Sequence, residues 1–104
     1  MIFTVLTLFP GIFDSPLRES ITKKAVEKGL ISFNIANIRE YADDAHKTCD
    51  DAPYGGGPGM VMKIEPIYRA MAHLEKTMGR PRYILLSPQG RIFDEETAIR
   101  YSHI

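Results

Sequence analysis

The stretch IFTVLTLF, residues 2–9, decides the fold of this 104-residue chain. It carries no charge and is rich in β-branched and aromatic side chains. Such a run is typical of a strand covered on both faces, and these strands occur mainly in parallel sheets flanked by helices. The run stops at Pro10, well short of the ~20 residues that a membrane-spanning helix needs. We therefore predict an α/β fold with a mainly parallel sheet and no membrane partner.

A helix and a second strand are predicted directly after this run. Residues 16–28 have apolar side chains at helical spacing, Ser15 can cap their start, and Gly29 marks their end. Residues 31–36 then alternate apolar and polar side chains, as a strand does. The three segments form a β-α-β unit, for which a right-handed crossover is expected.

Three further elements are predicted toward the end of the chain. Residues 66–78 keep an apolar helical stripe that ends at Gly79, residues 83–86 form a third strand, and Asp94 caps a third helix. The last helix has no stop signal, so we expect the chain to be a fragment of a longer protein. The apolar periodicity predicts a core that contains Leu6, Leu8, Ile21, Ile35, Ile67, Leu74 and Leu85.

The composition limits the size and the partners of this molecule. A chain of 104 residues, 44% of them hydrophobic, predicts a single domain over residues 1–104. Thirteen basic and thirteen acidic residues cancel, so the whole chain exerts no net attraction on nucleic acid or anionic lipid. A single cysteine, Cys49, excludes an internal disulfide and favours a reducing, cytoplasmic compartment.

Residues 50–60, DDAPYGGGPGM, lie in a segment where neither a helical nor a strand period holds. Gly59 is followed by Met60 rather than by Lys, which excludes a Walker phosphate loop, and the dinucleotide fingerprint would need glycine in place of Met60. Two interpretations stay open. The glycines form turns, or they let a ligand approach the backbone closely.

Two other segments are candidates for a binding site. Residues 87–90, SPQG, follow a predicted buried strand, and ligands bind at the carboxyl ends of strands in open α/β sheets. An ordinary type I turn explains the same four residues. Acidic and metal-ligating side chains also precede the glycines, but their spacing matches no zinc or calcium site, so a solvated acidic loop is the preferred interpretation. These side chains are Asp43, Asp44, His46, Cys49, Asp50 and Asp51.

The motifs YGGGPGM and YILLSPQGR, in that order, closely resemble the N-terminal part of the bacterial tRNA (guanine-N(1)-)-methyltransferases, the TrmD family. The segments LTLFPGIF and KAVEKGLI are similar to the same family, so the resemblance covers essentially the whole chain. It implies methyl transfer from S-adenosyl-L-methionine to N1 of the guanine beside the tRNA anticodon. It also implies a homodimer and a SPOUT-type fold whose trefoil knot is incomplete in this chain.

The resemblance also implies site residues. It places one wall of the cofactor pocket at Leu86, Ser87, Pro88, Gln89 and Gly90, and a loop near the entering guanine at Tyr54, Gly55, Gly56, Gly57, Pro58 and Gly59. The family's general base lies in a C-terminal domain, so no catalytic residue and no metal ligand is assigned here, and residues 1–104 alone are expected to be inactive. The alternative hypothesis is a stand-alone module that binds a nucleotide through the glycines or associates with itself.

Overall fold

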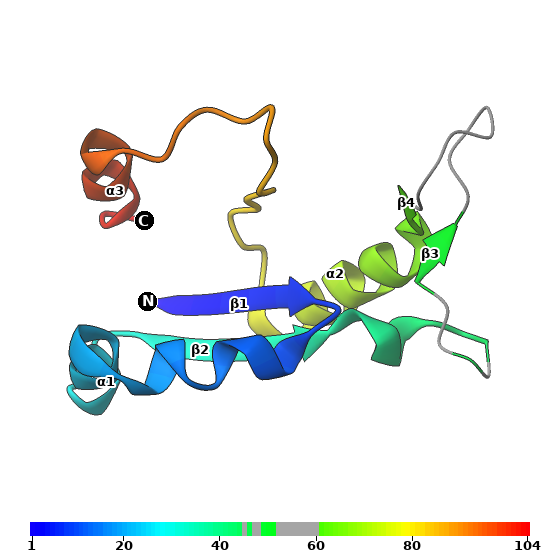
Figure 1. Ribbon diagram of the computed structural model, residues 1–104, viewed down its shortest axis with the longest axis horizontal. Coiled ribbons are helices and arrows are strands. Elements are labelled where there is room, and N and C mark those ends of the chain that lie inside the picture. Colours follow the sequence, from blue (N-terminus) through cyan, green and yellow to red (C-terminus); the bar gives the residue numbers. More distant parts are fainter. Residues whose placement is uncertain (45, 47–48, 52–60) are drawn as a thin grey trace.

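The computed structural model describes residues 1–44, 46, 49–51 and 61–104 (Figure 1). Its described strands form two small sheets, one parallel and one antiparallel, and helices lie beside them. In chain order the elements are β1 (Ile2–Thr7), η1 (Pro10–Phe13), η2 (Pro16–Arg18), α1 (Ser20–Glu27), β2 (Ser32–Asn37), η3 (Ile38–Tyr41), β3 (Asp50–Asp51), β4 (Val61–Met62), α2 (Ile64–Met78) and α3 (Glu95–Tyr101).

β1 and β2 form the predicted parallel pair. Their register runs from Ile2 opposite Ser32 to Thr7 opposite Asn37, and α1 provides the crossover between them. The α-amino group of Met1 donates a hydrogen bond of 3.1 Å to the carbonyl of Leu30, which fixes the start of the pair. The β-α-β unit predicted from the sequence is therefore confirmed.

The first helix is shorter than predicted. A 3₁₀ turn at η2 is separated from α1 by Glu19, whose backbone is extended, and Ser20 has a φ of 55°. A helix cannot continue through an extended residue, so the segment breaks there and Ser15 makes no capping hydrogen bond. Gly29, with a φ of 71°, ends the segment as predicted because glycine adopts this left-handed conformation without steric cost.

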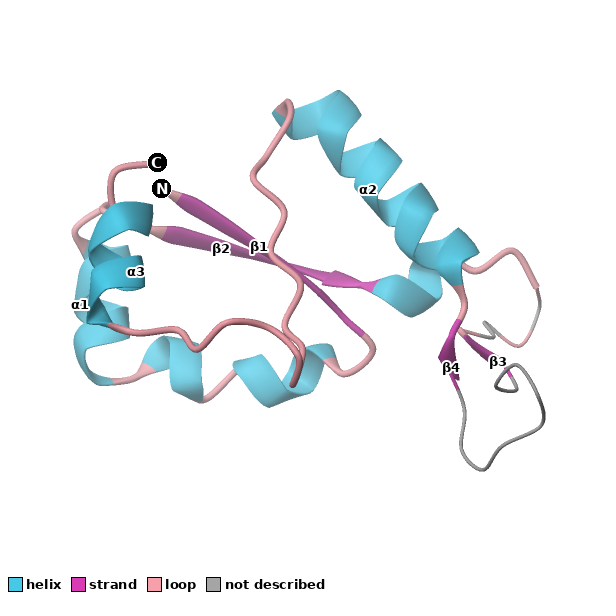
Figure 2. Ribbon diagram, turned by 90° about the horizontal axis from the view of Figure 1, so that it is seen from above, coloured by secondary structure: helices cyan, strands magenta, loops and turns pink. Residues whose placement is uncertain are grey.

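The core lies where β1, η3 and the start of α2 meet. Ile38, Ala42 and Cys49 are buried together, and Leu6, Leu8 and Ile67 pack against them half-buried. Figure 2 shows α2 beside the ends of the parallel strands. The C-terminal end of α2 is held by Met78, whose sulfur accepts weak hydrogen bonds from Thr4 and Asn34 at 3.9 and 3.7 Å.

The predicted core is partly right. Five of its members are half-buried, whereas Ile21 is 79% exposed and Leu85 is 89% exposed. Ile21 is exposed because α1 packs mainly on η2 rather than on the sheet. The half-buried members are Leu6, Leu8, Ile35, Ile67 and Leu74.

The predicted third strand at residues 83–86 is wrong. The parallel sheet contains only β1 and β2, and among the described residues no backbone hydrogen bond connects residues 83–86 to either strand. A strand exists only with a hydrogen-bonded neighbour, so an apolar run without one stays irregular. The side chain of Tyr83 instead donates a hydrogen bond of 2.6 Å to Glu75 on α2.

The segment after α2 extends away from the core. α3 lies apart from α2 (Figure 1), and the radius of gyration is 16.0 Å, against about 13 Å for a compact chain of this length. Asp94 caps α3 as predicted, with its carboxylate accepting a hydrogen bond of 2.8 Å from the amide of Thr97. The guanidinium of Arg82 lies 5.7 Å from the ring centre of Tyr101 and connects the two ends of this segment.

Candidate functional site

The turn at residues 87–90 is formed as the sequence predicts. The amide of Gly90 donates a hydrogen bond of 3.0 Å to the carbonyl of Ser87, with Pro88 at the second position. The amide of Gln89 donates a second bond of 3.2 Å to the hydroxyl of Ser87. A Cβ at Gly90 would lie 3.2 Å from the carbonyl oxygen of Ser87, so the turn leaves little room for a side chain there.

The residues before this turn form an open apolar surface. Leu85 and Leu86 are 89% and 90% exposed, and residues 83–90 are exposed throughout. Large apolar side chains that have no cover are unusual and mark places where another surface or a ligand binds. The segment can therefore supply one apolar wall of a binding site, with the backbone polar groups of the 87–90 turn beside it.

The second predicted site, Tyr54 with Gly55, Gly56, Gly57, Pro58 and Gly59, lies outside the described residues. Its flanks are described. β3 and β4 pair antiparallel, with Asp50 opposite Met62 and Asp51 opposite Val61. Residues 52–60 connect these two paired strands in the sequence. We call the pair of strands β3 and β4 the β3–β4 hairpin.

The base of the β3–β4 hairpin is fixed to the core. The amide of Lys63, just after β4, donates a hydrogen bond of 2.7 Å to the carbonyl of Cys49, just before β3. Cys49 is 1% exposed and packs with Ile38 and Ala42. The hairpin thus starts and ends at a buried anchor.

The described flanks of the two predicted sites lie at opposite ends of α2. The β3–β4 hairpin precedes the first turn of α2, and the segment with the 87–90 turn follows its last turn, so the length of the helix separates them (Figure 1). Fifteen helical residues span about 22 Å at a rise of 1.5 Å per residue. How residues 54–59 lie relative to the 87–90 turn is outside the described residues.

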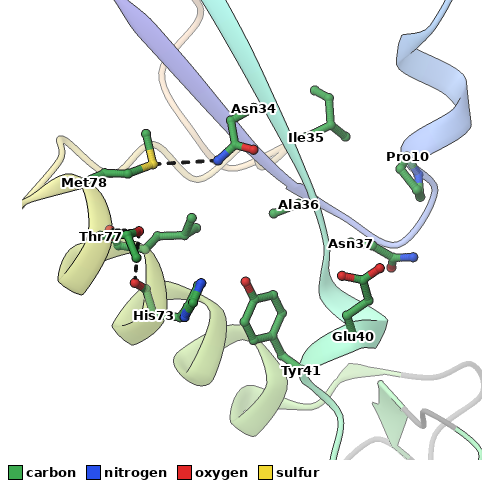
Figure 3. A pocket seen from close by; sticks show the side chains of 11 residues that line it. Pro10, Asn34, Ile35, Ala36, Asn37, Glu40, Tyr41, His73, Thr77 and Met78 are labelled. Atoms are coloured by element: carbon green, nitrogen blue, oxygen red, sulfur yellow. Dashed lines mark hydrogen bonds between the residues drawn. The ribbon is translucent and has the colours of Figure 1, made fainter.

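A hollow that the sequence did not predict lies at the carboxyl end of β2 (Figure 3). It has a volume of about 410 Å³ and lies between β2, η3 and α2. Its polar lining includes Asn37, Glu40, Tyr41 and His73, and the rings of Tyr41 and His73 lie 5.8 Å apart. The sequence offers one signal for this hollow: ligands bind at the carboxyl ends of parallel strands, and residues 31–36 are predicted as such a strand. None of the residues of the 87–90 turn lines it.

The acidic cluster does not form a metal site among the described residues. No group of three His, Cys, Asp or Glu side chains in the described part of the chain could hold an ion. Asp43 instead accepts a hydrogen bond from Arg69, and Cys49 is buried in the core. None of the described helices is both long and apolar enough to cross a bilayer.

Two exposed groups have shifted pKa values, and both shifts have local structural causes. The hydrogen bond to Glu75 raises the pKa of Tyr83, because ionisation would remove the donated proton beside a carboxylate. The hydrogen bond from the amide of Thr97 lowers the pKa of Asp94, because it stabilises the carboxylate. Both shifts thus come from hydrogen bonds within the segment that follows α2 or with α2 itself.

A parallel β-α-β unit, a second long helix beside it and an exposed segment after that helix define an α/β protein. Residues 1–104 match the family described as tRNA (Guanine-1)-methyltransferase TrmD. The chain belongs to this family.

Named relatives and a solved structure agree with this assignment. The tRNA (guanine-N(1)-)-methyltransferase of Geobacter metallireducens is 51% identical over 98 residues, which cover 94% of this chain and 40% of that protein. The protein of the same name from Anoxybacillus flavithermus is 53% identical over 95 residues, covering 90% and 39%. The crystal structure of the tRNA (m1G37) methyltransferase from Aquifex aeolicus matches with a TM-score of 0.72 and 40% identity, covering 78% of this chain and 36% of that one. The chain therefore spans about 40% of the length of these relatives.

Proposed function

We propose that the protein to which this chain belongs transfers a methyl group from S-adenosyl-L-methionine to N1 of the guanine beside the tRNA anticodon. The observation that supports this most strongly is the family match over residues 1–104. The names of the relatives support it too, since they are tRNA (guanine-N(1)-)-methyltransferases at about half identity.

We further propose a SPOUT-type fold with a trefoil knot, of which residues 1–104 are the N-terminal part of one methyltransferase domain. The parallel pair of β1 and β2 and the likeness to the Aquifex aeolicus structure support this proposal. The working assembly is a homodimer in the cytoplasm, with tRNA as its substrate.

Residues 86–90 are the proposed cofactor wall. The segment fits this role because the side chain of Leu86 is exposed and can pack on a flat apolar ligand, and because the 87–90 turn beside it leaves little room for a Cβ at Gly90. When bound, S-adenosylmethionine supplies an electrophilic methyl group on a sulfonium. The contribution of Leu86, Ser87, Pro88, Gln89 and Gly90 is to hold and orient this group and to exclude water on one side.

Residues 54–59 are the proposed contact for the guanine. The support is the sequence motif and the described hairpin base, which connects both flanks of these residues to the core through Cys49 and Lys63. Four glycines within five residues let a flat base approach backbone polar groups that a side chain would cover.

A methyl-transfer assay tests the proposed function. The whole-length protein is incubated with radiolabelled S-adenosylmethionine and an unmodified tRNA that carries guanine beside its anticodon. Transfer to N1 is expected, and a tRNA with another base at that position is expected to accept no label. Absence of transfer to the guanine-bearing tRNA would refute the proposal.

Glycine variants test the proposed cofactor wall. Gly90→Ala forces the turn to shift, because its Cβ would lie 3.2 Å from the carbonyl oxygen of Ser87. We expect cofactor affinity, measured by equilibrium dialysis, to fall about tenfold, or about 1.4 kcal/mol. Gly11→Ala is the matched control, since a Cβ there meets no atom within 4 Å. Equal affinities of the two variants would exclude residues 86–90 as the wall.

A further inference from the structure

Arg69 on α2 contacts two points of the chain that leads into the β3–β4 hairpin. Its Nη1 donates a hydrogen bond of 3.0 Å to the backbone carbonyl of Tyr41, and its Nη2 donates one of 2.9 Å to Oδ2 of Asp43. Tyr41 is the last residue of η3. One side chain therefore connects α2 to the start of the segment between η3 and β3.

The same segment is fixed at its other end. Cys49 is buried beside Ile38 and Ala42, and its carbonyl accepts the 2.7 Å hydrogen bond from the amide of Lys63. Arg69 thus holds the first residues of the segment, and Cys49 holds the last. These are two described anchors that precede β3.

The chemistry of the contact requires arginine. A guanidinium presents its N–H groups in a planar fork, so it can donate to a carbonyl and to a carboxylate at the same time, whereas the ammonium of lysine is a point charge on a flexible stem. The side chains of Arg69 and Asp43 are 40% and 78% exposed, and an ion pair this open to solvent contributes little to stability. The bond from Arg69 to the carbonyl of Tyr41 is part-buried, so this charge-assisted bond supplies most of the free energy with which Arg69 holds the segment.

We propose that Arg69 is a positioning residue for the methyl-transfer reaction: through Tyr41 and Asp43 it orients the β3–β4 hairpin on α2. This inference rests on the proposed function, in which the residues connecting β3 to β4 contact the guanine. Arg69 does not touch the substrate. It keeps the hairpin base in the orientation that binds tRNA before the tRNA arrives.

Steady-state kinetics of the whole-length protein test this role. When only a fraction of molecules has the binding-competent orientation, the apparent affinity falls by that fraction, while saturating substrate restores the competent form. Arg69→Ala is therefore expected to raise KM for tRNA about tenfold and to leave kcat within about twofold. A merely structural role would lower kcat by reducing the amount of folded enzyme and leave KM unchanged, and that result would overturn the proposal.

Three variants sharpen the test. Lys76→Ala, which removes an exposed cation of the same helix, is the matched control and is expected to leave KM unchanged. Asp43→Asn leaves the bond from Arg69 to the carbonyl of Tyr41 in place, so it is expected to raise KM less than Arg69→Ala does. Arg69→Lys keeps the charge but not the fork, and its KM is expected to lie between the wild type and Arg69→Ala. A KM for Arg69→Lys equal to that of the wild type would refute the argument from the planar fork.

Hydrogen exchange separates this inference from the proposed function. In the whole-length protein, Arg69→Ala is expected to speed exchange of the Lys63 amide about tenfold, while Lys76→Ala leaves it unchanged. If the wild type transferred no methyl group but the exchange result held, the proposed function would fail and the orienting contact would stand. Unchanged exchange at Lys63 in Arg69→Ala would overturn the inference whatever the activity.

Discussion

Phe3 and Phe33 stack on each other across the two parallel strands, with ring centres 5.5 Å apart and planes inclined by 24°. They are also direct neighbours in the register of β1 and β2, although thirty positions separate them in the sequence. The contact therefore joins the two ends of the β-α-β unit.

A double-mutant cycle measures this contact. Replacing Phe3 and Phe33 by Leu, singly and together, keeps an apolar side chain and removes the ring pair. We expect a coupling free energy of about 0.5–1 kcal/mol, the usual value of an aromatic pair beyond its buried area. Urea unfolding gives the four free energies, and additive single effects would show that the rings do not interact in solution.

Two isoleucines with opposite surroundings test the location of the core. Ile38 is 3% exposed and Ile21 is 79% exposed. Ile38→Ala is expected to lower the free energy of unfolding by about 2–3 kcal/mol, because it leaves a cavity, whereas Ile21→Ala changes it by about 0.5 kcal/mol or less. Thermal unfolding monitored by circular dichroism compares them. A larger loss for Ile21→Ala would place the core on α1 instead.

Local signals explain which elements the sequence predicts correctly. Asp94 caps its helix with its own carboxylate, Gly29 and Gly79 adopt positive φ at helix ends, and Ser87 accepts the hydrogen bond that closes its own turn. Each of these interactions lies within a few residues, so residue type and spacing are sufficient to predict it. The apolar run of β1 is equally clear because its character persists over a whole strand.

Contacts between distant segments explain the rest. Nothing near Ile21 or Leu85 in the sequence tells whether another element covers them, and the structure leaves both exposed. The bond from Arg69 to Asp43 spans 26 residues and follows no periodic pattern. Neither the hollow at the end of β2 nor the burial of Cys49 could be predicted, since both depend on how α2 and η3 come together.

The hydrogen bond between Tyr83 and Glu75 predicts a shifted titration. Because the bond raises the pKa of Tyr83 above its ordinary 10.0, the neutral phenol is favoured in the folded chain. Its stabilising effect is complete below the unfolded pKa and is lost as the pH rises through the folded one. NMR of ¹³C-labelled tyrosine is expected to show Glu75→Gln returning the Tyr83 pKa toward 10.0. Glu65→Gln, on the far end of α2, should leave it unchanged, and an equal shift in both variants would exclude the specific bond.

The cap of α3 predicts the opposite pH dependence. The amide of Thr97 holds the pKa of Asp94 below its ordinary 3.8, so the cap stabilises the helix above that value and is lost as the pH falls through the lower, folded pKa. We expect the ¹³Cα shifts of α3 to lose their helical character between neutral pH and about pH 2. Asp94→Asn keeps a good cap that does not titrate, so its α3 should stay helical across the range. An equal loss of helical ¹³Cα shifts at low pH in the wild type and in Asp94→Asn would assign the effect to another titrating group.

Residues 1–104 by themselves are predicted to bind S-adenosylmethionine weakly and to methylate no tRNA. Small-molecule sites usually bury about 70–90% of their ligand's surface, whereas the proposed wall offers Leu86 with 90% of its own surface open to solvent. The strands β3 and β4 and the 87–90 turn also flank opposite ends of α2. Equilibrium dialysis and the methyl-transfer assay, with the whole-length protein as the positive control, measure both expectations.

The missing chemistry explains why we expect no turnover rather than slow turnover. Methyl transfer to a ring nitrogen of guanine requires removal of its proton by a positioned base, and holding both reactants in place contributes about 7–11 kcal/mol of the barrier reduction in favourable cases. Asp94, the described carboxyl group with a lowered pKa, accepts a hydrogen bond from Thr97 as the N-cap of α3, and α3 lies away from β3 and β4 (Figure 1). Clear transfer by residues 1–104 would therefore show that the reaction centre lies within them, and Asp50, Asp51 and His46 would be the first residues to replace.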